Sequence, residues 1–127
     1  MTLINYEVPT DEIGQNANIK GYIFPDEEMQ KFGFRYIEET PNRPGGVWRL
    51  FKTLIYDISL TVDIFPNGNV KIDVLDEDFL QPYDFQNLIR NNYVLTTPYK
   101  VLILVRGELL KLKEAGIIYD WNYEDYI

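Results

Sequence analysis

The chain contains no histidine and no cysteine, and its only serine is Ser59. Without imidazole it lacks the side chain that most often acts as a general base near neutral pH. Without thiols it lacks thiolate nucleophiles, disulfide bonds and the soft ligands of a structural zinc site. The composition therefore favours a binding protein over an enzyme, and we expect neither a cofactor nor a bound metal.

Basic side chains are also scarce, since 12 lysines and arginines face 20 aspartates and glutamates, for a formal charge of −8. This excess of negative charge opposes direct binding to DNA, RNA or an anionic membrane surface. It favours a basic protein partner, and proteins that handle nucleic acids are common examples. The alternative is that the charge serves only solubility.

Long hydrophobic runs are absent, and none approaches the roughly 20 residues that a membrane-spanning helix needs. Residues 1–8 lack the basic start and the apolar stretch of a signal peptide. We therefore expect a cytoplasmic protein. The length of 127 residues suits one domain, which we place at residues 25–127, with residues 1–24 as an N-terminal extension or an edge strand.

A β-hairpin is the clearest local pattern in the sequence. Hydrophobic and polar residues alternate at residues 58–64 and again at 70–74, and the turn Pro66-Asn67-Gly68 stands between them. A three-residue loop fixes the register of the two strands. The predicted pairs are Ile64 with Val70, Val62 with Ile72, and Asp63 with Lys71.

The other predicted elements surround this hairpin. A short helix opens at Pro25 and ends at Gly33, and strands follow at residues 34–37 and 47–53. A second helix runs from Pro82 to about Asn92. The result is an α+β fold in the order α-β-β-β-β-α-α, with a four-stranded antiparallel sheet and helices packed on one face.

Residues 98–115 fit either one helix or a strand followed by a helix. We prefer one helix because hydrophobic residues recur at helical spacing and Gly116 is a suitable C-terminal cap. The residues that carry this spacing are Leu102, Val105, Leu109 and Leu112. Gly107 argues against the helix, because an interior glycine costs up to about 1 kcal/mol.

The C-terminal residues 119–127 alternate carboxylates with aromatic side chains. Aromatic residues are enriched at the energetic centres of interfaces, and carboxylates pair with arginine. We therefore predict a partner-binding surface there, although Trp121 and one or two tyrosines could pack on the sheet instead. The predicted binding residues are Tyr119, Asp120, Trp121, Tyr123, Glu124, Asp125 and Tyr126.

A second acidic cluster, Asp76, Glu77 and Asp78, follows the predicted hairpin. We predict that it also belongs to the interaction surface, with carboxylates standing where phosphates of a nucleic acid would lie. A cation site is the alternative, because hard cations prefer carboxylates, but the run lacks the glycine and ligand spacing of an EF-hand. Asp84 is predicted to stabilise the start of the following helix.

Three segments resemble small proteins of phages, plasmids and integrative elements of Gram-positive bacteria. They are residues 28–34, the run 73–86 with the sequence DVLDEDFLQPYDFQ, and residues 114–118 together with Tyr126-Ile127. Small acidic proteins of such elements are similar in kind to type II-A anti-CRISPR proteins, which inhibit Cas9. The resemblance implies a bacterial host cell and supplies no catalytic or binding residues. The ending 119–127 is more acidic and aromatic than in those proteins.

These observations lead to one functional prediction and two alternatives. We predict a mobile-element inhibitor that binds a basic host protein, the Cas9–guide RNA complex above all, and blocks DNA binding or cleavage partly by acidic DNA mimicry. The first alternative is a phage or plasmid structural or assembly protein that self-associates through its aromatic residues, as a homodimer for example. The second is an enzyme that depends on a metal held by carboxylates at residues 76–78.

Overall fold

The computed structural model describes residues 19–41, 44–90 and 96–119. Its centre is a five-stranded antiparallel sheet in the order β2-β3-β4-β5-β6. The α+β class is therefore confirmed, whereas the predicted four-stranded sheet gains a fifth strand. The strands are β2 (Phe34–Ile37), β3 (Val47–Ile55), β4 (Ile58–Ile64), β5 (Val70–Asp76) and β6 (Gln81–Pro82).

The β4–β5 hairpin has the predicted register. Ile64 lies opposite Val70, Val62 opposite Ile72, and Asp63 opposite Lys71. In the turn, the Phe65 amide donates to the Asn69 carbonyl at 2.9 Å, and Gly68 has a φ of +88°. Only glycine adopts that backbone angle without steric cost, so the turn and the alternating pattern specify the same pairing.

The fifth strand, β6, replaces the predicted start of a helix. Pro82 pairs with Leu75 of β5, and the helix α3 (Phe85–Arg90) begins three residues later. A proline is tolerated here because an edge strand need not donate its outward N–H group. The Asp84 carboxylate accepts a hydrogen bond from the Asn87 amide at 3.2 Å, which confirms its predicted role at the start of the helix.

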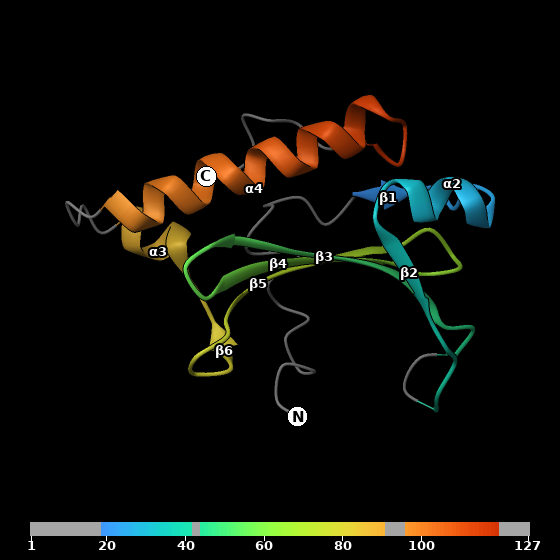
Figure 1. Cartoon of the computed structure of the whole chain (residues 1–127), viewed down its shortest axis with the longest axis horizontal. Coiled ribbons are helices and arrows are strands. Elements are labelled where there is room, and N and C mark those ends of the chain that lie inside the picture. The colour runs from blue at the N-terminus through green and yellow to red at the C-terminus, as the bar shows by residue number, and fades with distance from the viewer. Residues whose placement is uncertain (1–18, 42–43, 91–95, 120–127) are drawn as a thin grey trace.

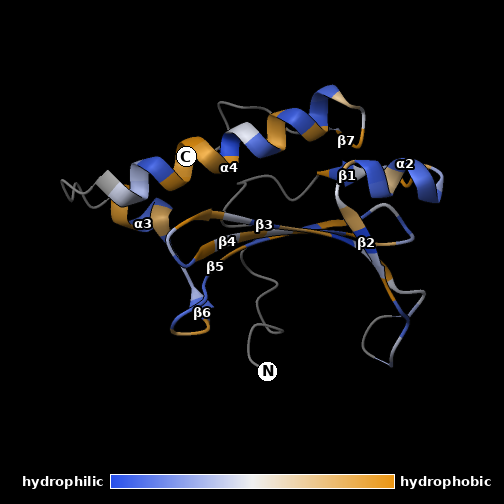
Figure 2. Ribbon diagram, viewed as in Figure 1, coloured by the Kyte–Doolittle hydropathy of each residue, from blue (hydrophilic) through white to orange (hydrophobic). Residues whose placement is uncertain are grey.

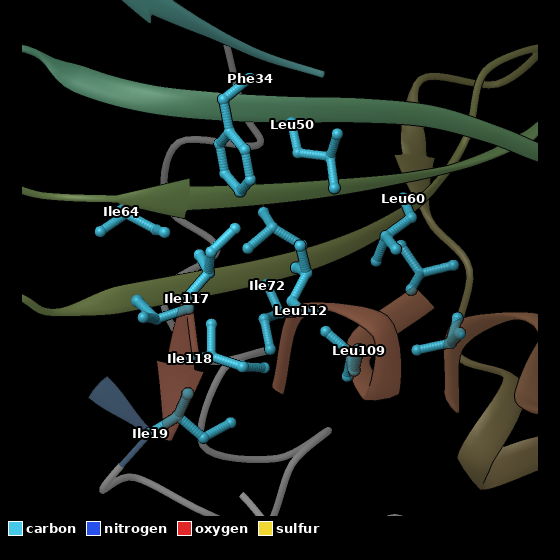
Figure 3. Close-up of a cluster of buried hydrophobic side chains, with 14 of the residues drawn as sticks. Ile19, Phe34, Leu50, Leu60, Ile64, Ile72, Leu109, Leu112, Ile117 and Ile118 are labelled. Carbon is cyan, nitrogen blue, oxygen red and sulfur yellow. The ribbon is translucent and has the colours of Figure 1, made fainter. Parts of the chain in front are cut away.

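One long helix, α4 (Thr96–Glu114), lies across one face of the sheet (Figure 1), so the prediction of one continuous helix is correct. Its buried face meets the hydrophobic side chains of β3, β4 and β5 in a single core (Figure 3). Leu60, Val62 and Ile64 of the sheet and Val101, Val105 and Leu109 of the helix are fully buried, each at 0% exposure. Hydrophobic residues concentrate in β3–β5 and recur along α4 (Figure 2).

A small two-stranded sheet and a short helix complete the described fold. The strand β1 (Lys20–Gly21) pairs antiparallel with β7 (Ile118–Tyr119), and α2 (Asp26–Lys31) precedes β2. A Cβ atom at Gly21 would lie 2.9 Å from Ile64 Cγ2, so the close approach of β1 to the main sheet requires glycine there. Part of the expected N-terminal extension thus belongs to the folded unit.

The face of the sheet opposite α4 carries a partly buried ion pair. Arg49 donates from Nε to Asp63 Oδ1 at 2.7 Å and from Nη2 to Oδ2 at 2.8 Å. The Asp63 side chain is only 6% exposed, so this bidentate pair compensates a charge that water hardly reaches. The hydrogen bond to Asp63 raises the pKa of Arg49. Over the described ranges, no helix is both long and apolar enough to cross a membrane.

Candidate functional site

Two turns meet at one end of the main sheet. The β3–β4 turn consists of Tyr56 and Asp57, and residues 77–80 connect β5 with β6. The Glu77 amide donates a hydrogen bond to the Asp57 carbonyl at 2.7 Å, which ties the two turns together. Figure 1 shows this end of the sheet beside β6. We call this surface the acidic edge and define it as Tyr56, Asp57, Asp76, Glu77, Asp78, Phe79 and Leu80.

Two of the three carboxylates predicted here are held in place by local hydrogen bonds. Asp76 Oδ1 accepts the amides of Asp78 at 3.0 Å and Phe79 at 3.4 Å, which shapes the turn. Ser59 Oγ donates to Glu77 Oε2 at 2.6 Å. The only serine of the chain, 1% exposed, therefore orients an acidic side chain of the edge.

Asp78 is exposed and faces a carboxylate that the sequence analysis did not include. A hydrogen bond with the Asp57 side chain and the negative charge of Asp57 raise the pKa of Asp78. Burial and, to a smaller extent, the charge of Asp76 raise the pKa of the nearby Tyr83. The smaller, electrostatic part of each shift comes from the negative charge of Asp57 or Asp76 at this end of the sheet.

Three basic side chains of the described residues form ion pairs away from this cluster. Arg49 pairs with Asp63, and Lys52 and Lys111 pair with Glu108. None of them involves a carboxylate of the acidic edge. The edge therefore presents its negative charge to solvent, where a basic partner could meet it.

Large hydrophobic side chains are exposed beside these carboxylates. Tyr56 and Phe79 are each 71% exposed, and Leu80 is 67% exposed. Figure 2 shows the hydrophilic and hydrophobic segments side by side in the turn before β6. Exposed aromatic side chains next to carboxylates are the combination that the sequence predicts for a partner-binding surface at residues 119–127.

The backbone at two of these exposed residues is strained. Tyr56 has a φ of +51° and Leu80 a φ of +49°, and no other non-glycine residue of the described ranges has a positive φ. A left-handed conformation costs an ordinary L-residue roughly 1–2 kcal/mol, which glycine or asparagine would largely avoid. Strain of this kind clusters at functional sites, so two strained and exposed hydrophobic residues mark the edge as a candidate site.

Tyr119, the described residue of the predicted C-terminal surface, lies away from the acidic edge. Tyr119, in β7, stacks against Tyr22 with ring centroids 5.3 Å apart, whereas residues 120–126 of the predicted surface lie outside the described residues. The neighbouring strand β1 bridges Asn69, at the start of β5, and Asp76 ends that strand. At about 3.3 Å per residue, β5 separates the two places by about 20 Å. Tyr119 and the acidic edge are therefore separate surfaces.

Sequence reasoning identified Asp76, Glu77 and Asp78 but missed Tyr56, Asp57, Phe79 and Leu80. A two-residue hairpin turn usually contains asparagine or glycine, so the Tyr-Asp turn was an available clue. The positive φ of Leu80 leaves no comparable mark in the sequence. Within the described residues, no group of three or more aspartates or glutamates is arranged to hold a metal ion.

Comparisons with protein-family models, with curated proteins and with solved structures found no match for this chain.

Proposed function

We propose that this chain is a non-enzymatic binding protein whose acidic edge docks on a basic protein that handles nucleic acid. The observation that carries the proposal is the coincidence of clustered carboxylates, exposed hydrophobic side chains and strained backbone in one small surface. Solubility alone needs dispersed charge and does not account for an exposed tyrosine and leucine held at positive φ.

The arrangement fits a surface that replaces a nucleic acid. Asp57 lies close enough to Asp78 to raise its pKa, through a hydrogen bond and through its negative charge. The two carboxylates thus lie together, as neighbouring phosphates of a nucleic acid do. Arginine forks on a partner would pair with these carboxylates, while Phe79 would supply the apolar contact. Attraction of this kind speeds association and weakens as salt screens exposed charges over about 8–10 Å.

The partner proposed for the first test is the Cas9–guide RNA complex. Cas9 reads its short DNA recognition sequence with arginines and holds the guide–target duplex in a basic channel. The run that carries the resemblance to mobile-element proteins, residues 73–86, contains most of the acidic edge. In this proposal the chain inhibits DNA binding or cleavage by occupying one of those basic surfaces.

The experiment titrates the protein into purified Cas9–guide RNA complex at low and high salt, and scores DNA binding and DNA cleavage separately. We expect wild-type protein to displace DNA, more strongly at low salt. The variant Asp57→Asn/Asp78→Asn should inhibit at least about tenfold less well. The variant Phe79→Ser should lose inhibition at both salt concentrations, because its contact is apolar.

The matched control is Asp26→Asn/Glu27→Gln on α2, which removes the same charge from another exposed place. If the control and the edge variant lose inhibition equally, the effect is one of net charge and the acidic edge is not the docking surface. If wild-type protein changes neither DNA binding nor cleavage, Cas9 is not the partner.

The C-terminal tail is tested separately in the same assay. The variant Asp120→Lys/Glu124→Lys/Asp125→Lys reverses its charge, and we expect weaker inhibition if the tail belongs to the binding surface. Inhibition equal to that of the wild type would leave the acidic edge as the docking surface on its own.

A further inference from the structure

The outward face of α4 carries exposed hydrophobic side chains that no part of the core uses. Ile103 is 64% exposed, Leu104 37% and Leu110 36%. Ile103 and Leu110 lie on the side of the helix opposite Val101, Val105 and Leu109, which pack on the sheet, and Leu104 lies at the margin of that side. With 3.6 residues per turn, the outward face consists of Lys100, Ile103, Leu104, Gly107, Leu110, Lys111 and Glu114.

Gly107 occupies the centre of this face. A Cβ atom at this position would meet nothing within 4 Å, so packing within the chain does not require glycine there. In the interior of a helix, glycine is about 1 kcal/mol less favourable than alanine. A glycine at the middle of an exposed, partly hydrophobic face allows the backbone of a second helix to approach closely.

The residues on either side of Gly107 complement one another across a two-fold axis. Consider a second α4 that crosses the first antiparallel at Gly107. A residue that precedes Gly107 by a given number of positions in one helix then faces the residue that follows Gly107 by the same number in the other helix. Leu104 then meets Leu110 of the other copy, Lys100 meets Glu114, and Ile103 lies level with Lys111. Each contact occurs twice, so the face is self-complementary in charge at its two ends and in hydrophobic contact at Leu104 and Leu110.

The charges on the outward face of α4 favour a second copy of the helix as the binding partner, and they favour the antiparallel orientation. A parallel two-fold arrangement would place Lys100 against Lys100 and Glu114 against Glu114, which is repulsive. The antiparallel arrangement pairs opposite charges at both ends of the contact. We propose that two copies of this chain form a dimer through antiparallel packing of their α4 helices, which cross at Gly107.

This dimer does not depend on the proposed docking function and does not compete with it. The outward face of α4 lies on one side of the sheet, whereas the turn of the acidic edge beside β6 projects on the other side (Figure 1). Each copy in the dimer would keep its acidic edge free.

The test is sedimentation velocity and equilibrium of the full chain from micromolar to millimolar concentration, with far-UV circular dichroism to confirm folding. We expect a wild-type dimer. Gly107→Leu should weaken it at least about tenfold, because the side chain blocks the crossing point. The same change favours helix formation, so unfolding of the monomer cannot explain the loss.

Charge variants test the antiparallel direction. Glu114→Lys and Lys100→Glu should each weaken the dimer, and Lys100→Glu/Glu114→Lys should restore it by exchanging the partners. The matched control is Glu27→Lys on α2, which should leave the association unchanged. A wild-type chain that stays monomeric throughout the range overturns the proposal. So does a dimer that tolerates Gly107→Leu, and failure of the exchanged pair to restore association overturns the antiparallel arrangement.

Discussion

Replacement of Leu80 by glycine is expected to stabilise the protein relative to replacement by alanine. Both substitutions remove the same exposed side chain, but alanine retains the steric cost of a φ of +49°. That cost is about 1–2 kcal/mol. Glycine loses about 0.5–1 kcal/mol more backbone entropy on folding, so the net advantage of glycine lies between about 0 and 1.5 kcal/mol, centred at about 0.75 kcal/mol.

The sign of this difference makes the experiment decisive. At positions with ordinary negative φ, glycine is the less stable of the two by about 0.5–1 kcal/mol. Urea unfolding of the two variants, followed by tryptophan fluorescence, to which the buried Trp48 contributes, measures the free energy of unfolding of each. If the glycine variant is the less stable one, Leu80 does not carry backbone strain and the strain argument for the acidic edge fails. We also expect both variants to bind a partner more weakly than the wild type, because both lack the leucine side chain.

Three further predictions concern stability. Arg49→Gln leaves the nearly buried Asp63 carboxylate without its ion pair and should lower the free energy of unfolding in urea by about 1–3 kcal/mol. The loss is smaller than for a fully buried pair because Arg49 is partly exposed. A loss below about 0.5 kcal/mol would refute the prediction. Because Asp57 raises the pKa of Asp78, protonation favours the folded state, and this stabilisation is present at low pH and lost as the pH rises through the raised pKa. Asp78→Asn should therefore raise the urea midpoint at pH 7 and leave it unchanged at pH 3. Leu109→Ala, at a fully buried site, should cost about 2–5 kcal/mol, and a smaller loss would show that the core collapses around the cavity.

The elements that local pattern and turn chemistry specify were predictable from the sequence. The β4–β5 hairpin followed from alternation and from the glycine of its loop, down to the pair of Asp63 with Lys71. The helix α4 followed from hydrophobic spacing, because 19 residues are long enough to outweigh Gly107. In both cases residues close together in the sequence determine the element.

The features that arise from non-local contacts were not predictable in this way. β6 is only two residues long and is defined by its pairing with the end of β5, where Pro82 lies opposite Leu75. Two residues are too few to show an alternation of hydrophobic and polar side chains. The candidate site was found only in part for a similar reason. Asp57 and Asp78 are far apart in the sequence, and only the fold brings their side chains together. The positive φ angles of Tyr56 and Leu80 depend on how the strands are connected.

The pairing of β1 with β7 has a consequence for the order in which the protein folds. Lys20 and Tyr119 are direct partners, although almost the whole described chain lies between them. Closing so large a loop is entropically costly, and contacts of long sequence separation are slow to form. We therefore expect the β4–β5 hairpin and α4 to form early, with β1 and β7 joining last. In hydrogen exchange, the Tyr22 amide, bonded to the Ile117 carbonyl at 2.8 Å, should then open more readily than the amides of β4.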